Sequence, residues 1–492
     1  MLNFKENNVK NLLEESVYFI RSNELNKAKL ILQKVMLIES HNKTANLNFG
    51  AILVLQKQYE ESQIFFKKVL KIDENNFIAN FNLGIAYLKS LSIKKASKFL
   101  EKANYLKPNN SDVLHQLGDL NLKTSNVNEA EYYYKKVNKM LPKNITILNQ
   151  LNIIFQIKKD YKKSVIFLKE ALNLQKGNFF LVYALGLLQL MMGDYKKGLK
   201  NFECRKKITK ININLTKNQL NKEWSGENLN GKKILIIFEQ GIGDQINFAR
   251  YIFGIQKKYS AKIILLLKKN LHYLFKDFDF NIIDLESPIP KHDFYQYLLS
   301  LPLITYDRQN IFLENKKFIT TKNLKKPNII NKIKEIKGIK IAFNWRGNSN
   351  YQFDQFRSIP LKYFKKIFDI DKFSYISVQK NDFKELNAFR DYKNIYDFTP
   401  DLDNNNKLFY DTIQVLKEVD LLITADTALV HFASTLNIKT YLLLSHYHDW
   451  RWNIQIKSGT LYQNLKIIKQ SKINNWDDVF ENLFNKLNKI NF

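Results

Sequence analysis

The first 208 residues of the chain repeat at a period of 34 residues. The units follow one another without insertion and begin at Val9, Lys43, Phe77, Ser111, Ile145 and Phe179. A period of this length is typical of arrays in which each unit is a pair of antiparallel helices. One pair cannot bury its apolar face alone, so neighbouring pairs stack and share a continuous core. The repeat therefore predicts an α-helical solenoid over residues 1–208.

The third and fourth units carry the residues of a known repeat pattern. In chain order, the pattern positions hold Leu83, Gly84, Tyr87, Ala96, Leu100, Ala103, Pro108, Leu117, Gly118, Ala130, Tyr134 and Pro142. This set resembles the tetratricopeptide repeat (TPR), whose stacked helices expose an extended concave surface. The resemblance implies that the array docks a partner or holds an acceptor, either protein or glycan. A spacer or a dimerisation element is the alternative.

Residues 232–492 alternate short apolar runs with helix-like or polar connections. The runs cover residues 234–238, 262–267, 280–285, 295–301, 375–378, 421–424 and 440–444, and a further run begins at residue 339. Strands that alternate with helices at this spacing form parallel sheets. The pattern predicts two lobes, at residues 232–335 and 336–492, joined to the repeats by a linker at residues 209–231. Ligands of such sheets bind beyond the carboxyl ends of the strands.

Residues 232–252, KKILIIFEQGIGDQINFARYI, predict a strand, a glycine loop and a helix. Gly241 and Gly243, which follow Gln240, permit a tight turn and let a ligand approach the backbone. Asp244 stands at the start of the helix, where an aspartate can cap the helix, serve as a general base, or do both. The third glycine of the dinucleotide-binding fingerprint is missing, which argues against a dinucleotide oxidoreductase.

A second polar loop lies in residues 421–436, LLITADTALVHFASTL. Asp426 or Thr427 is expected to cap the helix that starts there. A helix N-terminus with unpaired amides is a ready diphosphate site, to which Thr427 and Ala428 would donate. His431, one turn into the helix, would reach the same anion. An ordinary helical histidine is the alternative.

The third loop, NWRGNSNYQFDQFRSIP at residues 344–360, supplies two arginines and an asparagine. Arg346 and Arg357 match phosphate oxygens because a guanidinium group offers two parallel hydrogen bonds. Asn348 adds a further polar group in the same loop. Since this chain is basic throughout, a solvated basic loop is the alternative.

The formal net charge of +30 and the pI near 9.6 would suit nucleic acid, an anionic membrane surface or a phosphorylated ligand. Lysine is frequent in every segment, however, and no nucleic-acid-binding signature accompanies it, so we expect no nucleic-acid partner. The single cysteine, Cys204, excludes an intramolecular disulfide and indicates a reducing compartment. No apolar run has the length of a membrane span or of a signal peptide. A cytoplasmic location is expected, and peripheral membrane contact stays open.

No metal is expected from the sequence. His446, His448 and Asp449 share one loop, but two histidines and one carboxylate are an incomplete set of ligands. No other cofactor is predicted, and a nucleotide-sugar would be a substrate.

Several stretches in a fixed order resemble bacterial TPR glycosyltransferases, whose catalytic half is similar to the heptosyltransferase family (glycosyltransferase family 9). The stretches are WSGENLNGKKILIIFEQGIGDQINFARYI, IAFNWRGNSNYQFDQFRSIPL, SVQK, ADTALVHFAS and HDWRW. The likeness covers essentially the whole chain, and a more remote one is to O-GlcNAc transferase. It implies the GT-B fold, with two Rossmann-like lobes, a nucleoside-diphosphate sugar held mainly by the C-terminal lobe, and no obligatory metal.

By position, Asp244 resembles the carboxylate proposed as general base in heptosyltransferases, and residues 426–431 resemble their D-T-x-x-x-H diphosphate element. Two departures bear on the donor. A lysine expected in the first loop of the second lobe is not apparent, and Arg346 stands in that loop instead. Gln245 follows the aspartate where serine or threonine is frequent. The leading hypothesis is an inverting sugar transfer, and the alternative is a non-catalytic TPR scaffold with a degenerate GT-B domain.

Overall fold

The computed structural model describes residues 2–208, 222–305, 319, 327–349, 351–380, 383–404, 406–453 and 461–490. Contacts divide the chain into two compact units, residues 1–155 and 156–492. The division falls inside one helix, α9 (Ile145–Ile157), so the last helices of the repeat array belong to the second unit. The domain bounds drawn from the sequence at residues 208, 231 and 335 stay a prediction, and much of the expected linker lies outside the described residues.

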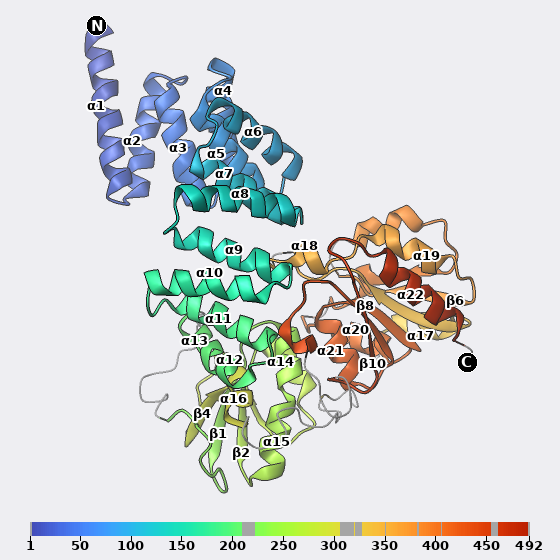
Figure 1. The fold of residues 1–492 in the computed structure, drawn as a ribbon. Coiled ribbons are helices and arrows are strands. Elements are labelled where there is room, and N and C mark those ends of the chain that lie inside the picture. Colours follow the sequence, from blue (N-terminus) through green and yellow to red (C-terminus); the bar gives the residue numbers. More distant parts are fainter. Residues whose placement is uncertain are drawn as a thin grey trace. The chain divides into compact units, whose positions relative to one another are not determined.

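The first unit consists of helical pairs, coloured blue to teal in Figure 1. The helices are α1 (Leu2–Arg21), α2 (Leu25–Ile38), α3 (Lys43–Leu55), α4 (Tyr59–Ile72), α5 (Phe77–Lys89), α6 (Ile93–Leu106), α7 (Ser111–Lys123), α8 (Val127–Met140) and most of α9. The first helices of the second to fifth repeats start at the residues that the sequence period predicts. In the first repeat, α1 starts at Leu2 instead of near Val9.

An asparagine at the same position of successive repeats sets the start of each first helix. Asn42, Asn76 and Asn110 each accept a hydrogen bond from a backbone amide in the first turn, as with Ala79 N at 3.0 Å from Asn76 Oδ1. This bond satisfies an amide that has no partner within the helix. The 34-residue spacing of the caps therefore reproduces the helix starts along the array.

The glycines of the pattern permit close packing between the two helices of a pair. A Cβ atom on Gly84 would lie 2.8 Å from the side chain of Leu100, and one on Gly118 would lie 2.5 Å from Tyr134. Both partner side chains are fully buried. Because protein cores are close-packed, these positions accept no side chain without moving the second helix. The packing explains why the pattern requires glycine there.

In the second unit, the last repeat helices share a core with the first sheet. These helices are α10 (Tyr161–Leu174), α11 (Phe179–Met191), α12 (Tyr195–Phe202) and α13 (Arg205–Ile208). Leu190, Leu199 and Phe202 pack in the same cluster as Ile234 and Ile236 of the sheet. The end of the array is therefore part of the α/β unit's hydrophobic core.

The first sheet has four parallel strands in the order β3-β2-β1-β4. They are β1 (Lys233–Ile237), β2 (Lys262–Leu266), β3 (Asn281–Ile283) and β4 (Phe294–Tyr297), and the helices α14 (Ile242–Phe248) and α15 (Arg250–Lys258) follow β1. The predicted run at residues 295–301 is strand only at its start. Helix α16 (Leu301–Thr305) begins at its end, where Pro302 is acceptable because a first-turn amide needs no partner in the helix.

The second sheet has six parallel strands in the order β10-β9-β8-β5-β6-β7. They are β5 (Ile339–Asn344), β6 (Phe373–Ser377), β7 (Ile395–Asp397), β8 (Leu421–Ala425), β9 (Thr440–Leu444) and β10 (Leu465–Lys469). The sequence missed β7 and β10. Both lie at the edges of the sheet, where a strand is less apolar and its pattern is weaker.

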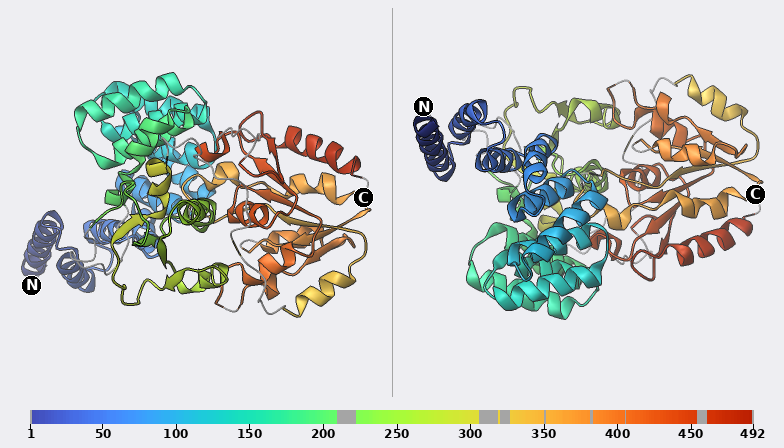
Figure 2. Two further views of the ribbon diagram at one scale, coloured as in Figure 1. Left: turned by 90° about the horizontal axis from the view of Figure 1, so that it is seen from below. Right: turned by 90° about the horizontal axis from the view of Figure 1, so that it is seen from above.

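Helices cover both faces of this sheet. They are α17 (Ile329–Glu335), α18 (Asp354–Arg357), α19 (Lys365–Phe368), α20 (Tyr410–Leu416), α21 (Ala428–Thr435) and α22 (Asp477–Asn488). Ile341 and Phe343 of β5 pack on the side of α22, whereas Ala342 packs on the side of α17, as the alternation of a strand requires. Figure 2 shows α17 (yellow) and α22 (red) on opposite sides of the strands.

The fold class expected from the sequence is confirmed, because TPR helices precede an α/β part that contains two parallel sheets. Within the described ranges, every helix is too short or too polar to cross a lipid bilayer.

Truncation tests whether the last repeats belong to the core. A chain that starts at Asn144 keeps α9 whole, together with the asparagine that accepts from Ile147 N at 3.1 Å. We expect it to unfold cooperatively in a thermal melt followed by circular dichroism. A chain that starts at Lys222 loses Leu190, Leu199 and Phe202, each worth about 1.5–3 kcal/mol of buried apolar surface, and should aggregate or lose its melting transition. Equal melting temperatures for the two chains would contradict the shared core.

Candidate active site

One cavity of about 600 Å³ in the second unit collects every residue that the sequence assigns to a candidate site. These residues are Gln240, Gly241, Gly243, Asp244, Arg346, Asn348, Arg357, Asp426, Thr427, Ala428 and His431. They come from the loops that follow β1, β5 and β8.

The strand order explains why these three loops meet. In the first sheet the chain moves outward from β1 to β3 and then returns to place β4 on the other side of β1. In the second sheet it moves from β5 to β7 and then returns to place β8 beside β5. Parallel sheets bind ligands outside the carboxyl ends of the strands at such reversal points. The loops after β1, β5 and β8 are the ones at the two reversals.

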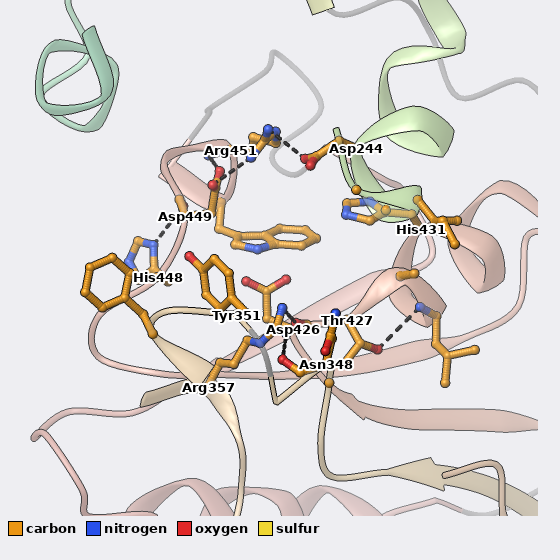
Figure 3. A pocket seen from close by; sticks show the side chains of 18 of the residues that line it. Asp244, Asn348, Tyr351, Arg357, Asp426, Thr427, His431, His448, Asp449 and Arg451 are labelled. Atoms are coloured by element: carbon orange, nitrogen blue, oxygen red, sulfur yellow. Dashed lines mark hydrogen bonds and ion pairs between the residues drawn. The ribbon is translucent and has the colours of Figure 1, made fainter. Parts of the chain in front are cut away.

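Asp244 lies in the first turn of α14 and is ion-paired with an arginine that the sequence did not single out. The N-cap of α14 is Gly241, so Asp244 is not the cap that the sequence allowed. Arg451 Nη2 lies 2.7 Å from Asp244 Oδ1, and Arg451 Nη1 lies 2.6 Å from Asp449 Oδ2 (Figure 3). Burial raises the pKa of Asp244 and Asp449 adds to the rise, while Arg451 opposes it.

The start of α21 is held by a buried asparagine at the end of β5. Thr427 is the N-cap, and its Oγ1 accepts from Leu429 N at 3.3 Å, as expected for that position. The hydroxyls of Thr424 and Thr427 donate to Asn344 Oδ1 at 3.2 and 3.3 Å. Asn344 Nδ2 in turn donates to Gln379 Oε1 at 2.7 Å. These bonds join β5, β6 and β8 directly below the cavity.

His431 is a neutral, buried imidazole. His431 Nδ1 lies 2.9 Å from the Tyr462 hydroxyl, which donates to Asn247 Oδ1 at 3.3 Å. In the tautomer that fits both bonds, Nδ1–H donates to Tyr462 and Nε2 keeps a lone pair. Burial lowers the pKa of His431 well below its usual value, and Arg451 lowers it further. The ring is stacked on Trp452 at 5.4 Å between centroids. His431 therefore offers a hydrogen-bond acceptor at Nε2.

Arg357 is fixed in place before any ligand arrives. Its Nε donates to Asp354 Oδ1 at 2.8 Å, and its Nη1 donates to the carbonyl oxygen of Asp426 at 3.3 Å. The guanidinium group lies over the ring of Tyr351, 4.5 Å from the centroid. A Cβ atom on Gly347 would lie 2.5 Å from Nη2, so this glycine makes room for the arginine. Because this side chain is already ordered, it loses little conformational entropy when it binds an anion.

Arg346 stands in the same loop with a different partner. Its Nη2 lies 3.0 Å from Glu385 Oε1, and its backbone amide donates to Gln379 Oε1 at 2.9 Å. About a third of its side chain is exposed, and it lines the cavity. The pairing with Glu385 reduces the positive charge that Arg346 presents to a ligand.

Asp426 is a carboxyl group whose charge is unfavourable in this cavity. Burial raises its pKa to about 6 and the nearby Asp449 contributes, against the lowering effects of Arg357 and of a hydrogen bond with Trp452. Near neutral pH the group titrates. In its protonated form it does not repel an anion.

Among the described residues, no group of three histidine, cysteine, aspartate or glutamate side chains could hold a metal ion. His448 Nδ1 lies 3.0 Å from the carbonyl oxygen of Asp449, and burial lowers the pKa of His448 to about 4. The Asp449 carboxylate pairs with Arg451 instead.

The cavity also contains residues for which sequence reasoning assigned no role. The HDWRW stretch provides Arg451 and Trp452, and the end of β5 provides Asn344. A polar residue directly after a buried apolar run was the available signal for Asn344. Leu187 and Met191 of α11 also line the cavity. No sequence signal distinguishes these two from ordinary apolar positions of a repeat.

Comparison with known proteins identifies the repeats. Residues 44–76 and 78–110 match the tetratricopeptide repeat model. No curated protein matches the chain at a significant level. Similar solved structures include YrrB, described as a TPR protein with an unusual peptide-binding site, at 22% identity over 36% of this chain and 91% of that chain, with a TM-score of 0.31. PilF of Pseudomonas aeruginosa is 14% identical over 42% and 93%, with a TM-score of 0.37. A TPR protein of Parabacteroides merdae is 20% identical over 40% and 78%, with a TM-score of 0.36.

The raised pKa of Asp426 predicts that the wild-type protein and the variant Asp426→Asn differ in stability, by an amount that depends on pH. The folded state holds this proton more tightly than the unfolded state, whose pKa is near 3.8, so stability falls as pH rises from about 4 to about 6. Asp426→Asn should therefore raise the free energy of unfolding above pH 6 by about 1–2 kcal/mol, allowing for partial exposure of the group to water. Below pH 4 the two proteins should be alike.

Urea denaturation at pH 4 and pH 7.5 measures this difference. The exposed Asp401 supplies the matched control, Asp401→Asn, which should be neutral at both pH values. A destabilised Asp426→Asn at pH 7.5 would contradict the raised pKa.

Proposed function

We propose that the second unit transfers a sugar from a nucleoside-diphosphate donor to an acceptor hydroxyl, with inversion and without a required metal. The observation that carries the proposal is the cavity itself, in which a carboxylate from the first lobe faces a preset arginine and a capped helix from the second. The sequence likeness to TPR glycosyltransferases of GT-B fold supports the same reaction. Two parallel-sheet lobes are consistent with that fold.

The diphosphate would bind to the second lobe. Arg357 supplies a fixed positive charge, and the first amides of α21 behind Thr427 supply donors at a helix N-terminus. Arg346 would join them by exchanging Glu385 for a phosphate oxygen. Negative charge grows on the diphosphate as the bond to the sugar breaks, so these groups act most strongly in the transition state.

His431 would bind the sugar rather than the phosphate. Its Nε2 carries a lone pair, which accepts a hydrogen bond from a hydroxyl group but repels a phosphate oxygen. In that tautomer His431 would accept from a donor hydroxyl, while the contact with the diphosphate expected from the sequence stays a prediction. His431 and Asp244 both line the cavity, which would place the sugar near the carboxylate.

Asp244 would act as the general base. As the acceptor oxygen attacks the anomeric carbon, its proton passes to the carboxylate, and the bond between that carbon and the diphosphate breaks. The electron pair leaves with the diphosphate, and the configuration inverts. Arg451 favours the ionised form of Asp244 against the effect of burial, since its guanidinium group lies 2.7 Å away. Arg451 is thus a positioning residue for the base.

The repeats would dock a protein or glycan acceptor. Stacked TPR units provide an extended surface for a partner, and the last of them contributes Leu187 and Met191 to the cavity. This arrangement would join acceptor binding and the site of transfer within one polypeptide.

Binding of nucleoside diphosphates tests the donor site. UDP, GDP or ADP at 100 times its Kd should stabilise the protein by about 2.7 kcal/mol in a thermal-shift assay. Arg357→Gln should weaken the response about tenfold or more, because a hydrogen bond to a charged group is worth about 1.5–3 kcal/mol. The exposed Arg390, changed in the same way, is the control. If none of the three nucleotides shifts the wild-type melt, the protein is better explained as a TPR scaffold.

Removal of the base tests the chemistry separately. Asp244→Asn should lower kcat for nucleoside-diphosphate release from the selected sugar donor roughly 10²–10⁴-fold and leave diphosphate binding unchanged. The exposed Asp477, changed to Asn, should behave as wild type. Wild-type turnover in Asp244→Asn would exclude Asp244 as the base.

A further inference from the structure

A second group of basic side chains lies at the carboxyl ends of β9 and β10. Lys469 is the last residue of β10, and His446 follows β9 by two residues. Lys159 reaches the same place from the turn that precedes α10, and its Nζ lies 3.4 Å from His446 Nδ1. His446 N donates to Gln470 Oε1 at 3.0 Å, which fixes the loop against β10. Three elements of the second unit thus bring three basic groups together.

The hydrogen bonds of His446 conflict with one another. Its Nδ1 lies 3.4 Å from the ammonium group of Lys159 and 3.1 Å from the carbonyl oxygen of Ser471. To bond with Lys159, Nδ1 must accept, and to bond with Ser471 it must donate. It cannot do both in one tautomer. The conflict at His446 Nδ1 would disappear if Lys159 Nζ donated to another acceptor.

The carboxylates around this group are already engaged. Asp160, adjacent to Lys159, is paired with Lys163 at 2.7 Å. Asp449 is paired with Arg451, and Asp478 Oδ2 accepts from the amide of Ser471. In the part of the chain that the structure describes, no carboxylate lies within ion-pair distance of Lys159 or Lys469.

The pKa values of the basic groups in this cluster are all lowered. Partial burial lowers the pKa of both Lys159 and Lys469, that of Lys469 to about 8, and Lys159 lowers it further. They are the two described lysines with a lowered pKa, although the chain is rich in lysine. Burial lowers the pKa of His446 and of the neighbouring His448, and the same two lysines lower it further. A bound anion would raise these pKa values, because it favours the protonated forms.

We propose that Lys159, His446 and Lys469 form a binding site for a phosphate-sized oxyanion, either inorganic phosphate or a phosphate monoester. The anion would accept from both ammonium groups, and His446 Nδ1–H would then donate to Ser471 without conflict. The site is distinct from Arg357 and α21, which stand on the donor side. It adjoins the candidate active site through Tyr447 and His448, which line the cavity. The inference does not depend on the sugar transfer.

Chemical labelling of Lys469 tests the site at the level of single residues. Acetic anhydride at pH 8 modifies neutral amines, so Lys469 should react readily. Inorganic phosphate at ten times its Kd leaves about a tenth of the sites free and should slow this modification roughly tenfold. Lys466, exposed on the same strand, is the internal control and should be unaffected. Peptide mass spectrometry on the full-length protein, with sodium chloride at matched ionic strength, gives both rates.

Two variants decide where the anion is held. Lys159→Gln should abolish the protection of Lys469, because the site loses half of its ammonium charge. Arg357→Gln should leave the protection intact. Equal rates with and without phosphate, equal protection of Lys466, or loss of protection in Arg357→Gln would each overturn the proposal. A protein that fails to respond to nucleoside diphosphates but protects Lys469 would contradict the sugar transfer alone.

A second ligand, glycerol phosphate, distinguishes a site for inorganic phosphate from a site for a phosphate monoester. Glycerol phosphate should protect Lys469 as phosphate does if the site is open to a phosphate group carried by a larger molecule. Protection by inorganic phosphate alone would assign the site to the free ion.

Discussion

The candidate site depends on a close contact between the first turns of α14 and α21. A Cβ atom on Gly243 would lie 3.2 Å from His431 Cδ2 and 3.4 Å from Ala428 Cα, so only glycine allows this approach without displacement. The contact brings the carboxylate of Asp244 and the capped start of α21 to one cavity. Each helix begins at the carboxyl end of its own sheet. A larger residue at position 243 would separate the two groups on which the proposed chemistry relies.

Electrostatic balance inside the second unit differs from that of the chain as a whole. The chain carries a net charge of +30, but two arginines of the second unit, Arg205 and Arg451, are each paired with two carboxylates. Arg451 holds Asp244 and Asp449, and Arg205 lies 2.6 Å from both Glu203 and Glu239. A buried charge without such partners is costly. Lys159 is only partly buried and Lys469 is exposed, so water stabilises both ammonium groups although no described carboxylate pairs with them.

Arg205 also connects the repeats to the candidate site. It begins α13, and the residue it pairs with, Glu239, directly precedes the loop that contains Gln240 and Gly241. Arg205 Nη2 also donates to Ser300 Oγ at 2.7 Å, and Ser300 follows β4, an edge strand of the first sheet. Together with the shared core of Leu190 and Phe202, these bonds make the last repeat a structural part of the α/β unit.

The sequence by itself determined the features that depend on local pattern. The 34-residue repeat predicted the starts of α3, α5, α7, α9 and α11 to the residue, since each first helix starts next to a capping asparagine. Apolar runs predicted the central strands, and polar residues after β1, β5 and β8 predicted the cavity-lining loops. The loops after β5 and β8 lie together because parallel strands of one sheet end at the same edge, whereas the loop after β1, in the other sheet, joins them through the contact between α14 and α21.

Only the tertiary structure decided the features that depend on distant partners. Arg451 could not be assigned to Asp244 from the sequence, because a 207-residue separation leaves no local sign of a 2.7 Å ion pair. The edge strands β7 and β10 were missed because they lack the continuous apolar pattern of buried strands. The same holds for Lys159 and Lys469, which are ordinary lysines in a lysine-rich chain until the fold places them together without a carboxylate. Packing and charge compensation between remote segments are set by the fold, and local pattern does not encode them.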